Sequence, residues 1–216
     1  MKVGTDSVLL GAWTPVVQPS RILDIGAGTG VLSLMMAQRF SSAYICAVEC
    51  NTVAAEECQE NICLSPWPYI QVKTLDIRDF HDKEKYDLII SNPPFFSEKT
   101  LAPNSARAQA RSSEHLPFSH LLYCVAGLLS PTGKFSVVIP YKEEAPFVQI
   151  AAPMGLYPKH ILHVQGTPEA PIKRSLLLFS FQKIANPLIE TLVIEKERHL
   201  YTKEYQELTK NFYLKF

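Results

Sequence analysis

Short apolar runs alternate with segments of helical periodicity along most of the chain. The runs predict strands at residues 21–25, 44–48, 70–73, 86–91 and 133–139. Helical periodicity predicts helices at residues 31–39, 118–129 and 143–154, and residues 157–164 and 176–182 alternate like two strands around a turn at 165–171. Because the strands are separated by helices, we expect an α/β fold with a Rossmann-like, seven-stranded sheet, mostly parallel and closed by an antiparallel edge hairpin.

The predicted strand at residues 86–91 ends in the sequence Asn92-Pro93-Pro94-Phe95. Two consecutive prolines cannot continue a sheet ladder, and open α/β sheets bind ligands at the carboxyl edge where such strands end. Asn92 Oδ1 and the Pro93 carbonyl are acceptors there, and Phe95 is a flat apolar ring. Together they suit a planar guest with an NH2 group, so we predict that Asn92, Pro93 and Phe95 are catalytic. An isolated Asn-Pro is more often a turn, and the interpretation therefore depends on the neighbouring motifs.

The first predicted strand runs into a glycine-rich turn. Gly26, Gly28 and Gly30 are spaced G-x-G-x-G, one residue shorter than the G-x-G-x-x-G of dinucleotide folds. Glycines let the backbone approach a ligand and aim free amides at it, although they also allow tight packing. Asp24 lies at the strand end, where a carboxylate suits a cationic amine better than a pyrophosphate. We predict that Asp24 and the three glycines bind a cofactor.

Two further strand ends carry acidic residues. Glu49 follows the second strand about 20 positions after the glycine turn, where an acidic residue accepts hydrogen bonds from ribose hydroxyls. Asp76 and Ile77 follow the third strand, where Asp76 could accept from an adenine amino group and Ile77 could cover the ring. We predict that all three bind the cofactor.

These strand ends together resemble those of class I S-adenosylmethionine-dependent methyltransferases that modify amines. Segments at residues 1–6, 9–13, 173–174, 201–205 and 212–215 narrow the resemblance to the bacterial tRNA1(Val) (adenine-37 N6)-methyltransferase family, over nearly the whole chain. The resemblance implies a methyltransferase fold, S-adenosylmethionine (SAM) as cofactor, tRNA as substrate, and Asn92 beside both. It also implies that Thr5 and Asp6 help to bind the cofactor. Family members usually carry a short segment before residue 1, which suggests a natural start upstream of Met1.

Composition indicates one domain over residues 1–216, with an N-terminal helical stretch at 1–20 and a substrate loop at 95–117. The chain is 47% hydrophobic and 19% charged, enough for a full core. Its cysteines lack the C-x-x-C spacing of zinc sites and its histidines are scattered, so we expect free thiols and no metal. We expect neither a signal peptide nor a segment that spans a bilayer, because no long apolar run occurs. We expect a cytoplasmic enzyme, monomeric and without membrane contact.

An RNA substrate requires a local basic surface, because the formal net charge is zero. Lys99, Arg107 and Arg111 follow the motif at 92–95, and Lys173 and Arg174 lie near the end of a late strand. We predict that these five residues contact tRNA. The alternative is a solvated loop whose arginines cap helices.

Other functions remain open at this stage. Enzymes that methylate N2 of guanine in rRNA, or N5 of glutamine in proteins, share an Asn-Pro-Pro-aromatic signature. Glutamine and DNA methyltransferases usually carry an additional domain, for which this chain has no room. A non-catalytic SAM-binding scaffold would be expected to have lost Asn92 or a loop glycine, and both are present.

Overall fold

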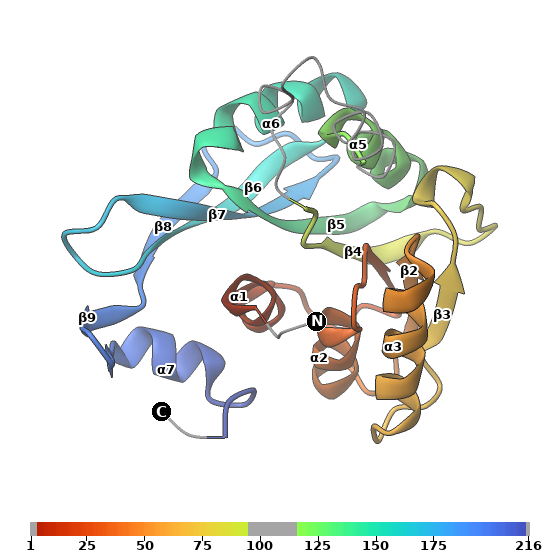
Figure 1. The fold of residues 1–216 in the computed structure, drawn as a ribbon. Helices are drawn as coiled ribbons and strands as arrows, with labels where there is room; N and C mark the ends of the chain where they lie inside the picture. The colour runs from red at the N-terminus through yellow and green to blue at the C-terminus, as the bar shows by residue number, and fades with distance from the viewer. Residues whose placement is uncertain (1–3, 95–115, 215–216) are drawn as a thin grey trace, which may run out of the picture.

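The computed structural model describes residues 4–94 and 116–214. Within them, one sheet of eight strands has the order β3-β2-β1-β4-β5-β7-β6-β8 (Figure 1). β7 is antiparallel to β5 and β6, and the other neighbouring pairs are parallel. The strands are β1 (Arg21–Ile25), β2 (Tyr44–Glu49), β3 (Gln71–Thr74), β4 (Tyr86–Ser91), β5 (Leu129–Pro140), β6 (Tyr157–Gln165), β7 (Ile172–Ser180) and β8 (Leu188–Val193).

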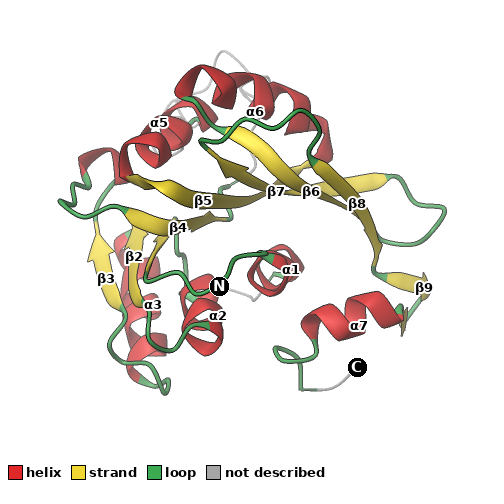
Figure 2. Ribbon diagram, turned by 180° about the vertical axis from the view of Figure 1, so that it is seen from behind, coloured by secondary structure: helices red, strands yellow, loops and turns green. Residues whose placement is uncertain are grey.

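Helices cover both faces of this sheet (Figures 1 and 2). One face carries α1 (Thr5–Trp13), α2 (Val31–Arg39), α3 (Thr52–Cys63) and α7 (Lys203–Thr209), and the other carries α5 (Phe118–Leu128) and α6 (Glu144–Ala151). Short 3-10 helices are η1 (Ile77–Asp79), η3 (Tyr141–Glu143) and η4 (Ala152–Met154). On β1, Ile22 packs with the first group of helices and Leu23 with the second. Because both faces are buried, the central strands are mostly apolar, which is why the sequence predicted them well.

The structure confirms the α/β class, the mostly parallel sheet and the antiparallel hairpin. The expected number of seven strands was wrong, because β8 pairs with β6 beyond the hairpin and makes eight. Leu188 and Ile189 of β8 are exposed and Leu192 is buried, so no continuous apolar run marks this edge strand. After β8 come β9 (Glu195–Glu197), β10 (Leu200–Tyr201) and α7, which packs against α1.

β5 also begins earlier than the predicted residue 133. Tyr86 on β4 pairs with Leu129 on β5, and Leu88 pairs with Lys134, so the extra residues between them interrupt the ladder. Among the described residues, no helix has the length and apolar character needed to cross a membrane.

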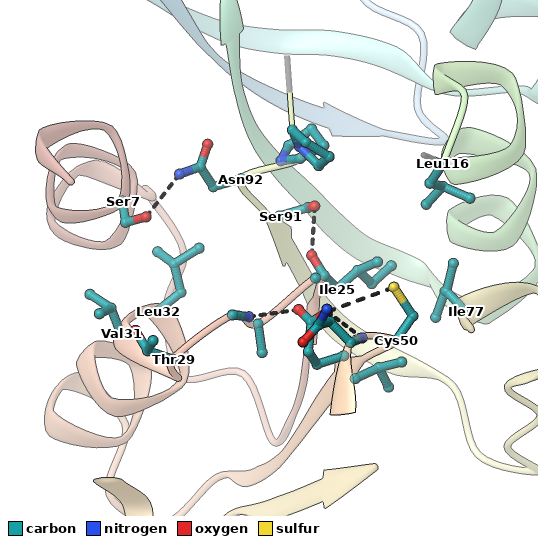
Figure 3. Close-up of a pocket in the computed structure, with 18 of the residues that line it drawn as sticks. Ser7, Ile25, Thr29, Val31, Leu32, Cys50, Ile77, Ser91, Asn92 and Leu116 are labelled. Carbon is teal, nitrogen blue, oxygen red and sulfur yellow. Dashed lines mark hydrogen bonds between the residues drawn. The ribbon is translucent and has the colours of Figure 1, made fainter. Parts of the chain in front are cut away.

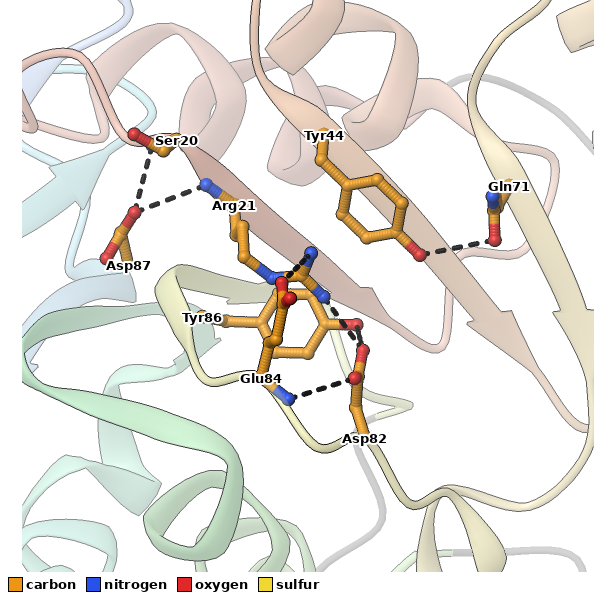
Figure 4. Close-up of polar contacts among 8 residues, drawn as sticks. All are labelled: Ser20, Arg21, Tyr44, Gln71, Asp82, Glu84, Tyr86 and Asp87. Carbon is orange, nitrogen blue, oxygen red and sulfur yellow. Dashed lines mark hydrogen bonds and ion pairs between the residues drawn. The ribbon is translucent and has the colours of Figure 1, made fainter.

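Arg21 anchors the amino-terminal edge of the sheet (Figure 4). Its guanidinium carbon lies 4.3 Å and 5.0 Å from the ring centroids of Tyr44 and Tyr86. The same group pairs with Asp82 at 2.9 Å and Glu84 at 2.7 Å. Since Arg21, Tyr44 and Tyr86 are the first residues of β1, β2 and β4, the cluster ties three strands together at the edge where they begin.

Candidate active site

A cavity of about 780 Å³ lies at the opposite edge, where the parallel strands end (Figure 3). The loops that follow β1, β2, β3 and β4 line it, so the sheet brings four separate stretches of sequence together. Gly4 and Ser7 at the start of α1 and Leu116 before α5 complete the wall. The cavity therefore occupies the position at which open α/β sheets bind ligands.

Backbone conformation requires the glycines of the loop after β1. Gly26, Gly28 and Gly30 have φ angles of 71°, 57° and 86°, in the left-handed region that other residues rarely adopt. The amides of Gly26 and Ala27 donate to the Val48 carbonyl at 2.9 and 3.1 Å, which fixes the loop against β2. A Cβ atom on Gly30 would also meet Cys58 Sγ at 2.8 Å. Gly26 and Gly28 line the cavity, whereas Gly30 caps the start of α2 and does not line it.

Glu49 joins the glycine loop to the end of β2. Its side chain is buried, and Oε2 accepts from the Gly28 amide at 2.8 Å while Oε1 accepts from the Asn51 amide at 2.9 Å. Oε1 also accepts from Cys50 Sγ at 3.7 Å, Oε2 can accept a second hydrogen bond, and Glu49 lines the cavity. The carboxylate can therefore hold the loop and still accept from hydroxyl groups of a guest.

Asp24 is fully buried beneath the loop, and it does not line the cavity. Oδ2 accepts from Ser33 Oγ at 2.7 Å, whereas Oδ1 has no hydrogen-bond partner in the part of the chain that the structure describes. Burial raises the pKa of Asp24 from 3.8 to about 7 against the lowering effect of the Ser33 hydrogen bonds, and the nearby Glu49 charge adds to the rise. A cationic group nearby would stabilise the ionised form of this carboxyl.

The loop after β3 places Asp76 and Ile77 on the cavity wall. Asp76 also forms an ion pair with Arg78, accepting from its backbone amide, Nε and Nη2 at 2.8, 2.9 and 2.6 Å. Hydrogen bonds from Arg78 lower the pKa of Asp76. Ile77 is buried and offers an apolar surface to the cavity. Nothing in the sequence pattern indicated this partner of Asp76.

Asn92, Pro93 and Pro94 form the wall at the end of β4. Asn92 Nδ2 donates to Ser7 Oγ at 2.9 Å (Figure 3). The preceding residue, Ser91, donates from Oγ to the Ile25 carbonyl at 2.7 Å and so binds the end of β4 to β1. With one N–H of Nδ2 donated to α1, Asn92 still has Oδ1 as an acceptor for a guest.

Other predicted site residues lie away from the cavity or outside the described residues. Asp6 Oδ2 accepts from Arg174 Nε at 2.8 Å, which links α1 to β7, and neither residue lines the cavity. Thr5 and Lys173 are exposed on α1 and β7. The predicted residues that lie outside the described part are Phe95, Lys99, Arg107 and Arg111.

Several lining residues were missed by sequence reasoning. Ser7, Thr29, Cys50 and Leu116 all face the cavity. Ser7 directly follows Thr5 and Asp6, which were predicted to bind the cofactor. Nothing in the sequence, however, indicated that Ser7 contacts Asn92. No group of three or more histidine, cysteine, aspartate or glutamate side chains that could hold a metal occurs among the described residues.

Comparison with known proteins assigns the family. The model for the methyltransferase small domain matches residues 3–142. Proteins named tRNA1(Val) (adenine(37)-N6)-methyltransferase from Bacteroides fragilis and Flavobacterium psychrophilum are 48% and 49% identical to this chain. The alignments cover 100% of this chain and 92% and 93% of those proteins. The chain belongs to the tRNA1(Val) (adenine(37)-N6)-methyltransferase family. It is therefore a methyltransferase, as the resemblance in the sequence indicated.

Solved structures agree with this family at the level of the fold. A "predicted O-methyltransferase" from Agrobacterium tumefaciens has a TM-score of 0.72 at 19% identity, covering 95% of this chain and 96% of that chain. The ribosomal protein L11 methylase of Lactobacillus delbrueckii has a TM-score of 0.58 at 16% identity, covering 81% and 76%. At these identities the similarity shows the class I methyltransferase fold alone.

Proposed function

We propose that this protein methylates N6 of adenine 37 in tRNA1(Val), in the cytoplasm, with SAM as the methyl donor. The observation that carries the proposal is the position of Asn92 on the cavity wall, with Nδ2 bound to Ser7 and Oδ1 left for an amine. An acceptor at this point selects a guest that carries N–H groups. The names of the relatives supply the identity of the amine.

The residues around the cavity fit SAM. The cavity is within the range of about 300–1,000 Å³ that is common for small-molecule sites. Glu49 would accept from the ribose hydroxyls: Oε2 has a lone pair that the Gly28 amide leaves unused, and on Oε1 a hydroxyl would replace the weaker Cys50 thiol donor. Ile77 would cover the adenine of the cofactor. The partnerless Asp24 Oδ1, which is fully buried and does not line the cavity, would act on the ammonium group of the cofactor only through its negative charge.

The chemical task of the protein is to orient the amine. When bound, SAM supplies an electrophilic methyl group. The lone pair of the adenine amino group is delocalised into the purine ring, which makes this nitrogen a poor nucleophile. Hydrogen bonds from its two N–H groups to Asn92 Oδ1 and the Pro93 carbonyl would turn the lone pair out of conjugation. Positioning of two bound reactants is worth about 7–11 kcal/mol in favourable cases, and no covalent intermediate is needed.

Access to the cavity requires that the target base leave its stack. An anticodon loop presents adenine 37 unpaired, which lowers this cost. Stacking of the base on Phe95, and tRNA contacts by Lys99, Arg107, Arg111, Lys173 and Arg174, remain predictions.

The proposal can be tested by incubating the purified protein with labelled SAM and separate fractions of tRNA, rRNA and protein from a strain that lacks the gene. We expect label in tRNA, and mass spectrometry should find N6-methyladenosine at position 37 of tRNA1(Val). Label in rRNA guanine or in protein glutamine would instead support one of the alternative methyltransferases. SAM binding without transfer to any fraction would support the scaffold.

A further inference from the structure

Tyr141 lies at the same edge of the sheet as Asn92, one strand further along. β4 and β5 are parallel, and Ser91, the last residue of β4, is opposite Val137 on β5. Asn92 follows Ser91 directly, whereas Tyr141 comes four residues after Val137. At about 3.3 Å per residue, Tyr141 begins η3 about 10 Å beyond the level of Asn92. A nucleotide next to a base held at Asn92 could reach this position.

His163 and the residues bonded to it hold the ring of Tyr141 in place. It packs edge-to-face on His163, with ring centroids 5.0 Å apart and planes at 84°. His163 Nε2 lies 2.8 Å from Glu144 Oε2, and Ser175 Oγ donates to the same oxygen. Ser175 is buried, and it is paired with His163 across β6 and β7. Three elements, α6, β6 and β7, therefore support the ring through one hydrogen-bonded network.

Despite this support, Tyr141 remains 41% exposed. The other exposed tyrosines among the described residues are elsewhere: Tyr69 precedes β3 at the amino-terminal edge, and Tyr123 is in the middle of α5. A fixed aromatic ring with an open surface is suited to stacking, because little side-chain freedom is lost when a base binds.

Two exposed lysines, Lys142 and Lys173, lie near Tyr141 in the sequence or across the sheet. Lys142 follows Tyr141, and its side chain is 73% exposed, with Glu143 at 3.8 Å as its ion-pair partner. Lys173 is exposed beside Arg174, and Arg174 is paired with Pro140 across β5 and β7. Aromatic rings for bases together with ammonium groups for phosphates characterise surfaces that bind single-stranded RNA.

We propose that Tyr141 stacks on an unpaired nucleobase adjoining the target adenine, while Lys142 and Lys173 contact the phosphates beside it. This inference rests on the proposed function, since it assumes an RNA whose target base is bound at Asn92. It assigns to the end of β5 a site separate from the cofactor cavity, because Tyr141 does not line that cavity.

The test compares Tyr141→Ala with Tyr141→Phe, which keeps the ring. We expect Tyr141→Ala to raise the KM for tRNA at least about fivefold, the lower end of what stacking of one base provides, and to leave SAM affinity unchanged. Tyr141→Phe should match the parent. An abasic nucleotide on one side of the target adenine should raise the KM for tRNA of the parent and of Tyr141→Phe. It should not raise the KM of Tyr141→Ala any further.

Three outcomes would overturn the inference: an unchanged KM in Tyr141→Ala, an equal defect in Tyr141→Phe, or additive effects of the abasic nucleotide and Tyr141→Ala. A parent enzyme that transfers no methyl group to tRNA would instead contradict the proposed function. In that case, binding of an RNA hairpin with 2-aminopurine beside the target adenine still tests the stacking. Its fluorescence should be quenched by the parent and by Tyr141→Phe and unaffected by Tyr141→Ala, and equal quenching by all three proteins would refute it.

Discussion

Asn92 Nδ2 donates a hydrogen bond to Ser7 Oγ at 2.9 Å, which joins residues 85 positions apart in the sequence. The bond connects the end of β4 to the first turn of α1, on the wall of the cavity. An asparagine amide offers both a donor and an acceptor, and its partner decides which of the two faces the guest. In this orientation α1 sets the direction in which Asn92 Oδ1 acts.

The first prediction concerns Asn92 itself. Asn92→Ala should lower methyl transfer at least about 10-fold, because one oriented acceptor is lost and the amine is misplaced. SAM affinity, measured by calorimetry, should stay within about twofold of the parent. Affinity for SAM that falls as steeply as turnover would show that Asn92 acts on the cofactor rather than on the amine.

Ser7 should act through Asn92. Ser7→Ala removes the partner of Nδ2 and should lower kcat about 2- to 10-fold, the range expected for one neutral hydrogen bond, with SAM affinity unchanged. Ser7→Thr keeps the hydroxyl and serves as the matched control. Equal kcat values for Ser7→Ala and the parent would mean that Asn92 is oriented by other groups.

Glu49 should be required for cofactor binding. Glu49→Ala leaves the amides of Gly28 and Asn51 without their carboxylate and should raise the Kd for SAM at least about 10-fold. Glu49→Gln keeps the size of the side chain and one acceptor, and its Kd should lie between those of the parent and Glu49→Ala. Titration calorimetry measures all three, and a parental Kd in Glu49→Ala would remove Glu49 from the cofactor site.

The ion pair of Asp6 and Arg174 should hold α1 against β7. Asp6→Arg or Arg174→Asp alone should lower the Tm by about 2–4 °C, as expected for about 1 kcal/mol in a chain of this size, and should reduce methyl transfer because α1 carries Ser7. The double variant with Asp6→Arg and Arg174→Asp should recover most of the lost Tm and most of the lost methyl transfer. If it recovers the Tm but not the activity on tRNA, the predicted RNA contact of Arg174 is favoured.

Asp24 should make stability depend on pH. Its pKa is raised to about 7 in the folded protein, so the neutral form is favoured there and ionisation opposes folding. Without SAM, the parent should lose up to about 1.4 kcal/mol of unfolding free energy per pH unit between about pH 4 and 7, and no more above that.

Asp24→Asn lacks this ionisation and provides the control for the pH dependence. Its Tm should be close to that of the parent at about pH 4 and should exceed it at pH 8, as measured by thermal unfolding at both values. Parallel curves for the two proteins across this range would contradict the raised pKa.

The sequence by itself determined the local parts of this protein. The strands β1, β2 and β4 were predictable because burial on both faces leaves continuous apolar runs. The G-x-G-x-G spacing marked the loop after β1, where the left-handed backbone favours glycine. The prolines after Asn92 marked the end of β4. Because parallel strands end at one edge, the order of these motifs along the chain was enough to place them at a common site.

Only the tertiary structure decided the partners of these residues. Ser7 meets Asn92, and Arg174 meets Asp6, because α1 packs against the sheet at the end of β4 and the start of β7. No periodicity in the sequence records such a contact. The eighth strand was missed for the same reason. β8 pairs at the sheet edge through its backbone while most of its side chains face solvent, so its sequence carries little of the apolar signal that marks a buried strand.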